Sequence, residues 1–150
     1  MNAFPELNLP IYELNISKND GRFYVFDPIR KQKVVLTPEE WIRQNFIQFL
    51  IKNRGYPKSL ISVESGLKYN NRSKRSDIVV YNLEGSPSVL VECKSVETKI
   101  NQATFNQTAV YNKTLKASIV IITNGLEHFC YRVNVDDGEF EFLEDVPHYK

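Results

Sequence analysis

Two carboxylates and a lysine, Asp77, Glu92 and Lys94, are the residues whose types and spacing suggest a definite chemistry. Each carboxylate lies at one end of a short apolar segment rich in strand-forming residues, and a turn sequence at residues 84–87 separates the two segments. Side chains two residues apart on a strand share a face, so Glu92 and Lys94 project together. The pairing of the two segments as a hairpin would bring Asp77 to the same place.

Converging carboxylates repel each other unless a cation lies between them. Oxygen ligands from Asp77, Glu92, the backbone carbonyl of Cys93 and water suit Mg²⁺, and Mn²⁺ would substitute for it. Lys94 would stand beside the ion, where it can orient or help deprotonate a water and neutralise charge that builds on a phosphate. The pattern therefore predicts hydrolysis of a phosphodiester by a metal-activated water.

A structural interpretation of the same residues stays open, because an acid-x-Lys triplet preceded by an aspartate occurs by chance in many soluble chains. Their context favours the functional interpretation. Charged residues are rarely placed in segments built for burial unless they are paired or bind a metal, and here two such segments carry them at matching ends.

A basic run directly precedes Asp77 and contains Arg72, Lys74 and Arg75. The whole chain has 19 Lys+Arg against 18 Asp+Glu, which excludes a generally basic surface, so nucleic-acid contacts must come from local patches. A short basic run is often only a solvated turn. Its position beside the predicted site favours contacts with DNA phosphates.

Length and composition predict one domain. The chain has 150 residues and is 42% hydrophobic, and we expect an extended arm at residues 1–20 followed by a single domain at residues 21–150. Cys93 and Cys130 lie in apolar runs, and no secretory leader or long apolar span is present, so we expect reduced thiols in a cytoplasmic protein that does not bind membranes. His128 and His148 lack the spacing of metal ligands.

The first half of the domain is predicted to hold a hairpin of residues 22–27 and 33–36, then a helix. Thr37 is its expected N-cap, with Glu40 completing a capping box, and the helix ends near residue 55. The expected buried stripe consists of Ile42, Phe46, Phe49 and Leu50. Extending this stripe backward by three residues makes Glu39 the better candidate for an additional acid at the site, while Glu40 stays possible.

The second half is predicted to contain a meander of strands at residues 60–68, 77–83 and 89–95, and a helix at residues 101–115. On that helix Gln107 and Tyr111 are four apart and share a face. A continuous apolar run at residues 118–123 predicts a buried strand parallel to the Glu92 strand, followed by strands at residues 126–133 and 138–143. The expected fold is a mixed α/β (α+β) domain with a central sheet of about five strands flanked by helices, plus an N-terminal hairpin.

The order of these elements and motifs resembles the PD-(D/E)xK nuclease superfamily. More narrowly, five segments resemble the N-terminal nuclease domain of type I restriction enzyme R subunits, and the resemblance covers roughly residues 20–150; the segments are residues 26–31, 36–44, 76–81, 91–94 and 122–125. It implies a restriction-endonuclease-like core, a magnesium ion held by Asp77 and Glu92, and a nucleophilic water positioned by Lys94. Ser76 stands where many members have proline.

The resemblance also implies that Gln107 and Tyr111 form the Gln-x-x-x-Tyr motif of the RecB-like branch, and that the helical acid of the superfamily is Glu39, with Glu40 not excluded. DNA is the implied partner, together with motor or specificity subunits of a restriction system. No Gly-rich, Lys-Ser/Thr phosphate loop is present, so this chain cannot drive translocation and is either a stand-alone protein or part of a longer one.

Two functions therefore compete. The first is a metal-dependent DNA endonuclease, and the second is a non-catalytic module that keeps the nuclease fold and binds DNA or a partner. The retained carboxylate pair favours the endonuclease, because two converging carboxylates cost stability when no cation lies between them.

Overall fold

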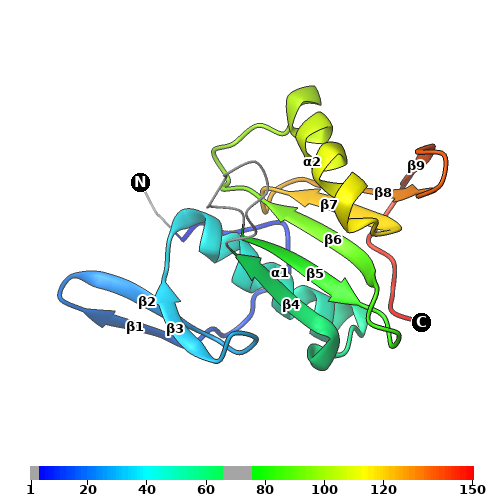
Figure 1. Cartoon of the computed structure of the whole chain (residues 1–150). Helices are drawn as coiled ribbons and strands as arrows, with labels where there is room; N and C mark the ends of the chain where they lie inside the picture. The colour runs from blue at the N-terminus through cyan, green and yellow to red at the C-terminus, as the bar shows by residue number, and fades with distance from the viewer. Residues whose placement is uncertain (1–3, 66–75) are drawn as a thin grey trace.

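The protein consists of a small N-terminal sheet and a larger central sheet flanked by two helices (Figure 1). The computed structural model describes residues 4–65 and 76–150, and the side chains of residues 4–63 and 78–150. The basic run that contains Arg72, Lys74 and Arg75 lies outside the described residues, and its predicted DNA contacts stay predictions.

The small sheet is antiparallel in the order β1-β2-β3, formed by Ile16–Asn19, Arg22–Asp27 and Gln32–Val35. Its first strand lies inside the segment that was expected to be an extended arm, so the predicted hairpin is a three-stranded sheet. Asp20 and Gly21 connect β1 to β2 with φ angles of 51° and 78°, the left-handed conformation of a tight hairpin turn.

The central sheet has six strands within the described residues, in the order β4-β5-β6-β7-β8-β9. All neighbouring pairs are antiparallel except β6–β7, which is parallel as predicted because α2 crosses between them. The strands are Ile61–Ser65, Ser76–Tyr81, Pro87–Cys93, Ile119–Thr123, His128–Val133 and Phe140–Leu143. A short 3₁₀ turn, Lys58–Leu60, precedes β4.

Two helices cover opposite faces of this sheet, α1 (Pro38–Arg54) and α2 (Gln102–Leu115) (Figure 1). Alternation along β6 separates two apolar clusters: Val89, Val91 and Cys93 pack with α1, whereas Leu90 packs with Tyr111 of α2. The mixed α/β class with a restriction-endonuclease-like core, predicted from the sequence, is therefore confirmed.

Helix α1 begins and ends with the predicted signals. The Glu40 backbone N–H donates to Thr37 Oγ1 at 3.0 Å, and Gly55 closes the helix in the left-handed conformation. The predicted apolar stripe of Ile42, Phe46, Phe49 and Leu50 is buried. The second half of the expected capping box is absent, because the Thr37 N–H donates to the Val35 carbonyl and the Glu40 carboxylate binds other side chains.

The segment before β1 is tied to the central sheet at Asn8. The Asn8 N–H donates to the Gly125 carbonyl at 2.9 Å, and His128 Nε2 lies 2.9 Å from the Asn8 carbonyl. His128 Nδ1 lies 2.7 Å from Thr123 Oγ1, so the ring bridges this segment and β7, and burial lowers its pKa. His128 thus links the N-terminal segment to the central sheet.

Across the described residues, no helix is long and apolar enough to cross a membrane.

Candidate active site

Glu92 and Lys94 meet at the end of β6. The Lys94 ammonium lies 3.4 Å from Glu92 Oε2, and the Glu92 side chain is 4% exposed whereas that of Lys94 is 26% exposed. The strand ends at Cys93, but the Lys94 N–H donates to the Thr123 carbonyl at 2.8 Å and so continues the pairing with β7 by one residue. Glu92 and Lys94 therefore project on the same face, as predicted.

The backbone of Asp77 lies next to that of Glu92. The strands β5 and β6 are antiparallel with Ile78 opposite Val91, and the next positions along the two strands are Asp77 and Glu92. The side chain of Asp77 lies outside the described part of the chain, so its predicted role as a metal ligand stays a prediction. The short connection between the strands, residues 82–86, imposes this register as expected.

Tyr111 of α2 packs on the sheet face from which Glu92 projects. Its side chain is 3% exposed and belongs to the apolar cluster that includes Leu90, two residues before Glu92 on β6. Gln107, one turn earlier on α2, is exposed. The helix therefore carries one buried aromatic and one solvent-facing amide, and their catalytic role stays a prediction.

Glu39 and Glu40, the alternative helical acids, differ sharply in their surroundings. The Glu40 carboxylate accepts hydrogen bonds from Arg30 Nη2 at 2.7 Å, Arg43 Nη1 at 2.6 Å and Gln44 Nε2 at 2.8 Å. Glu39 is 42% exposed and contacts Arg43 Nη2 at 3.0 Å. The Glu40 carboxylate thus has a structural role in place of the expected capping role, and Glu39 does not share the burial of the stripe from which it was inferred.

Arg30, the partner of Glu40, also binds Asp27, and together they link the β2–β3 turn to α1. The Asp27 side chain is completely buried and accepts from Arg30 Nε and from the backbone N–H groups of Ile29 and Arg30. Burial alone would raise the pKa of Asp27, but these hydrogen bonds outweigh it and hold that pKa below its usual value. The cluster fixes the small sheet against the helix.

The loop of residues 94–101 connects the site to α2. The hydrogen bonds that hold this loop were not predicted from the sequence. Asn124 Nδ2 donates to the Thr98 carbonyl at 2.9 Å, and Thr98 Oγ1 lies 3.1 Å from Ser95 Oγ. Asn101 then caps α2 by accepting from the Thr104 N–H. The only sequence signal for Asn124 was its place in an Asn-Gly turn.

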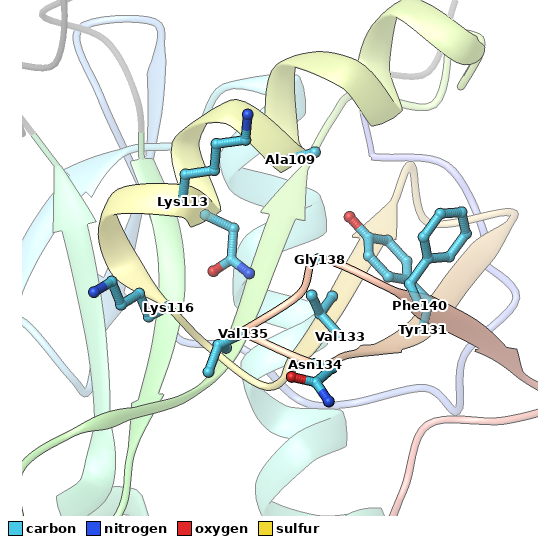
Figure 2. Close-up of a pocket in the computed structure, with 10 residues that line it drawn as sticks. Ala109, Lys113, Lys116, Tyr131, Val133, Asn134, Val135, Gly138 and Phe140 are labelled. Carbon is cyan, nitrogen blue, oxygen red and sulfur yellow. The ribbon is translucent and has the colours of Figure 1, made fainter.

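A pocket lies away from these residues, between the C-terminal half of α2 and the β8–β9 hairpin (Figure 2). Its volume is about 180 Å³, and Figure 2 shows Lys113 and Lys116 on one side with Tyr131 and Phe140 on the other. None of the predicted catalytic residues lines it. Tyr131 lines this pocket, and burial raises its pKa to about 12.

A divalent cation would fit the end of β6 only with ligands beyond Glu92. Among the described side chains, no group of three or more His, Cys, Asp or Glu is assembled to hold a metal ion. Glu92 supplies one buried carboxylate, and Asp77 and the Cys93 carbonyl are the predicted additional oxygen donors. Such an oxygen-only set is the kind that Mg²⁺ and Mn²⁺ prefer.

The fold and the acidic end of β6 together define a restriction-endonuclease-like domain. A scan against protein families matches residues 38–147 to the type I restriction enzyme R protein N terminus, and the chain belongs to this family. The resemblance noted in the sequence is confirmed. No curated protein and no solved structure matches the chain.

Proposed function

We propose that this protein is a metal-dependent DNA endonuclease of a restriction system. The observation that carries the proposal is the contact of 3.4 Å between Lys94 Nζ and the buried carboxylate of Glu92, at the position where β5 brings the Asp77 backbone alongside. A carboxylate that is 3% exposed is costly to bury, and a bound cation is a common reason for keeping one. Membership of the R-protein N-terminal family supports DNA as the substrate.

Each residue has a distinct role in this proposal. Glu92, Asp77 and the Cys93 carbonyl hold Mg²⁺, which supplies Lewis-acid polarisation of the scissile phosphate and a more acidic bound water. Lys94 is the more solvent-accessible member of the Glu92–Lys94 pair, and its ammonium orients the attacking water and offsets charge on the phosphate. Gln107 and Tyr111 support the site from α2, and Arg72, Lys74 and Arg75 contact the DNA backbone.

The test is a cleavage panel of supercoiled, linear, single-stranded and branched DNA with Mg²⁺ or Mn²⁺. Glu92→Gln and Lys94→Met should each lower the cleavage rate by at least about a hundredfold, since loss of one such group removes about 3 kcal/mol of transition-state stabilisation. Glu97→Gln and Lys99→Met are matched controls, because both residues are exposed in the loop that follows the site. The controls should retain the wild-type rate.

Calorimetric titration with Mn²⁺ separates this proposal from the non-catalytic alternative. The wild type should bind Mn²⁺ and Glu92→Gln should bind it weakly. Wild-type protein that neither binds Mn²⁺ nor cuts any DNA form would instead be a binding module with a nuclease fold. Cleavage that is unchanged in Glu92→Gln and Lys94→Met would refute the assignment of the site.

A further inference from the structure

The outward face of the small N-terminal sheet combines cations and aromatic rings. Side chains alternate along β2, and Val25 and Asp27 are completely buried, so Arg22, Tyr24 and Phe26 form the opposite, outward face. The strand register adds the neighbouring side chains to this face, which we call the outer face: Ser17, Asn19, Arg22, Tyr24, Phe26, Lys33 and Val35.

Charge on the outer face has one sign. Arg22 and Lys33 are exposed, and no member of the face carries a carboxylate. Two acids are adjacent to it in the sequence: Asp20, in the β1–β2 turn, and Asp27, which is buried on the opposite side of β2. Residues 16–35 contain five Lys or Arg and two Asp, whereas residues 132–145 contain one Arg and six Asp or Glu. Residues 16–35 therefore carry a net charge of +3, whereas the net charge of the whole chain is only +1.

The rings on the outer face are accessible to a ligand. Phe26 is 39% exposed, and it lies opposite Lys33 in the β2–β3 register. Tyr24 is half-buried and lies two residues from Arg22 on the same strand. Cations that flank aromatic rings on a sheet are the combination that binds nucleic-acid strands, with phosphates on the cations and bases stacked on the rings.

The small sheet has a fixed position on the domain, which a binding surface requires. The Asp27–Arg30–Glu40 contacts join its β2–β3 turn to α1, and β3 runs directly into Thr37, the N-cap of that helix. Figure 1 shows the sheet beside the first half of α1, projecting away from the central sheet. It precedes residues 38–147, the range that matches the family.

We propose that the outer face is a second DNA-binding surface, which holds an unpaired DNA strand outside the cleavage site. Arg22 and Lys33 contact phosphates, and Phe26 and Tyr24 stack on bases. The identity of the ligand as DNA rests on the proposed function, but the surface itself rests on the charge and exposure of these side chains.

The test measures DNA binding without cleavage. Fluorescence anisotropy with a labelled single strand and with its duplex, in EDTA, compares the wild type with Arg22→Gln/Lys33→Gln. The matched control is Lys58→Gln/Lys113→Gln, which removes the same charge from exposed lysines on other elements. Circular dichroism checks that each variant is folded.

We expect the outer-face variant to bind the single strand about tenfold more weakly at low salt. Its slope of log K against log salt should fall by about 1.4, because two phosphate contacts are lost at about 0.7 per contact for a single strand. The control variant should bind like the wild type. Phe26→Ser should weaken binding of the single strand about tenfold and leave binding of the duplex nearly unchanged, because only unpaired bases can stack on the ring.

Three outcomes would overturn the proposal: no binding of either DNA by the wild type, equal losses in the outer-face and control variants, or wild-type binding by the outer-face variant. These three outcomes concern DNA binding, and the cleavage panel tests the proposed nuclease activity separately. If the wild type binds DNA without cutting it, and only the outer-face variant binds more weakly, the DNA-binding surface is supported and the nuclease activity alone is refuted.

Discussion

Replacing Glu40 by alanine should destabilise the protein much more than replacing Glu39, although both acids lie on the same turn of α1. Glu40 is 7% exposed and accepts three side-chain hydrogen bonds, two of them from arginines that are 17% and 2% exposed. Glu40→Ala therefore leaves two largely buried guanidinium groups without this carboxylate. Breaking a buried pair by removing one partner costs about 3–5 kcal/mol, and we expect a loss of unfolding free energy in this range.

Glu39→Ala is the matched control. The Glu39 side chain is 42% exposed and contacts Arg43, and an ion pair whose carboxylate is this open to solvent contributes about 0–1 kcal/mol. Urea titration followed by circular dichroism measures both free energies of unfolding at neutral pH. A Glu39→Ala cost equal to that of Glu40→Ala, or a Glu40→Ala cost below about 1 kcal/mol, would refute this account of the buried cluster.

The same two variants address the alternative that the sequence left open. If Glu39 joins the active site, Glu39→Ala loses DNA cleavage while its free energy of unfolding is unchanged. Loss of cleavage in Glu40→Ala alone, together with lower stability, would place the requirement in the structural cluster instead. Both measurements are needed, because a loss of cleavage alone does not show whether the variant lacks an acid of the active site or has a destabilised helix.

Two further predictions concern buried titratable groups. Burial lowers the pKa of His128 below 6.5, so the unfolded chain binds a proton that the folded chain does not, and unfolding free energy should fall as pH drops below about 6.5 by up to about 1.4 kcal/mol per pH unit. His128→Gln, whose amide can still donate to Asn8, should remove that part of the slope, and an unchanged slope between pH 7 and 5 would contradict the assignment. Burial also raises the pKa of the Cys130 thiol to about 11, so iodoacetamide at pH 8 should alkylate Cys130 only in urea. Rapid labelling of this thiol in the native protein, detected by mass spectrometry, would show that β8 opens locally.

The sequence predicted those elements whose signals are local. Thr37 at the helix start, Gly55 at its end and the apolar spacing of Ile42, Phe46 and Leu50 depend only on neighbours within a few residues, and all appear as expected. The parallel pairing of β6 and β7 was predictable too, because a helix between two buried strands allows a crossover connection. Strand boundaries differ from those expected by a few residues at the ends of ladders.

Strand β1 shows that a local signal was also overlooked. Asp20-Gly21 is a strong hairpin dipeptide, and Ile16 and Phe23 flank it at strand-like spacing. The polar composition of residues 1–20 favoured an extended arm instead. Within the described residues the central sheet has six strands, which correspond to the six segments expected to be strands, although the sheet was expected to have about five.

The surroundings of Glu39 and Glu40 were not predictable from helical periodicity alone. The stripe argument assumes one buried side, but α1 is buried on two: the apolar side contacts the central sheet, and the side with Glu40, Arg43 and Gln44 faces the β2–β3 turn. In the sequence, the charged residues on this second side look like those of a solvent-exposed helix face. Their burial depends on Arg30 of another element, which no helical pattern contains.

The buried cluster also joins the small sheet to the central domain. The residues that match the family begin at Pro38, but Glu40 finds a charge partner in Arg30, which precedes that range and is itself fixed by Asp27. A chain that began at Pro38 would expose Glu40 and Arg43 to water and lose these contacts. The small sheet that carries the outer face therefore also contributes contacts that stabilise the domain. For this reason, only substitutions of exposed side chains such as Arg22 and Lys33 can separate DNA binding from folding.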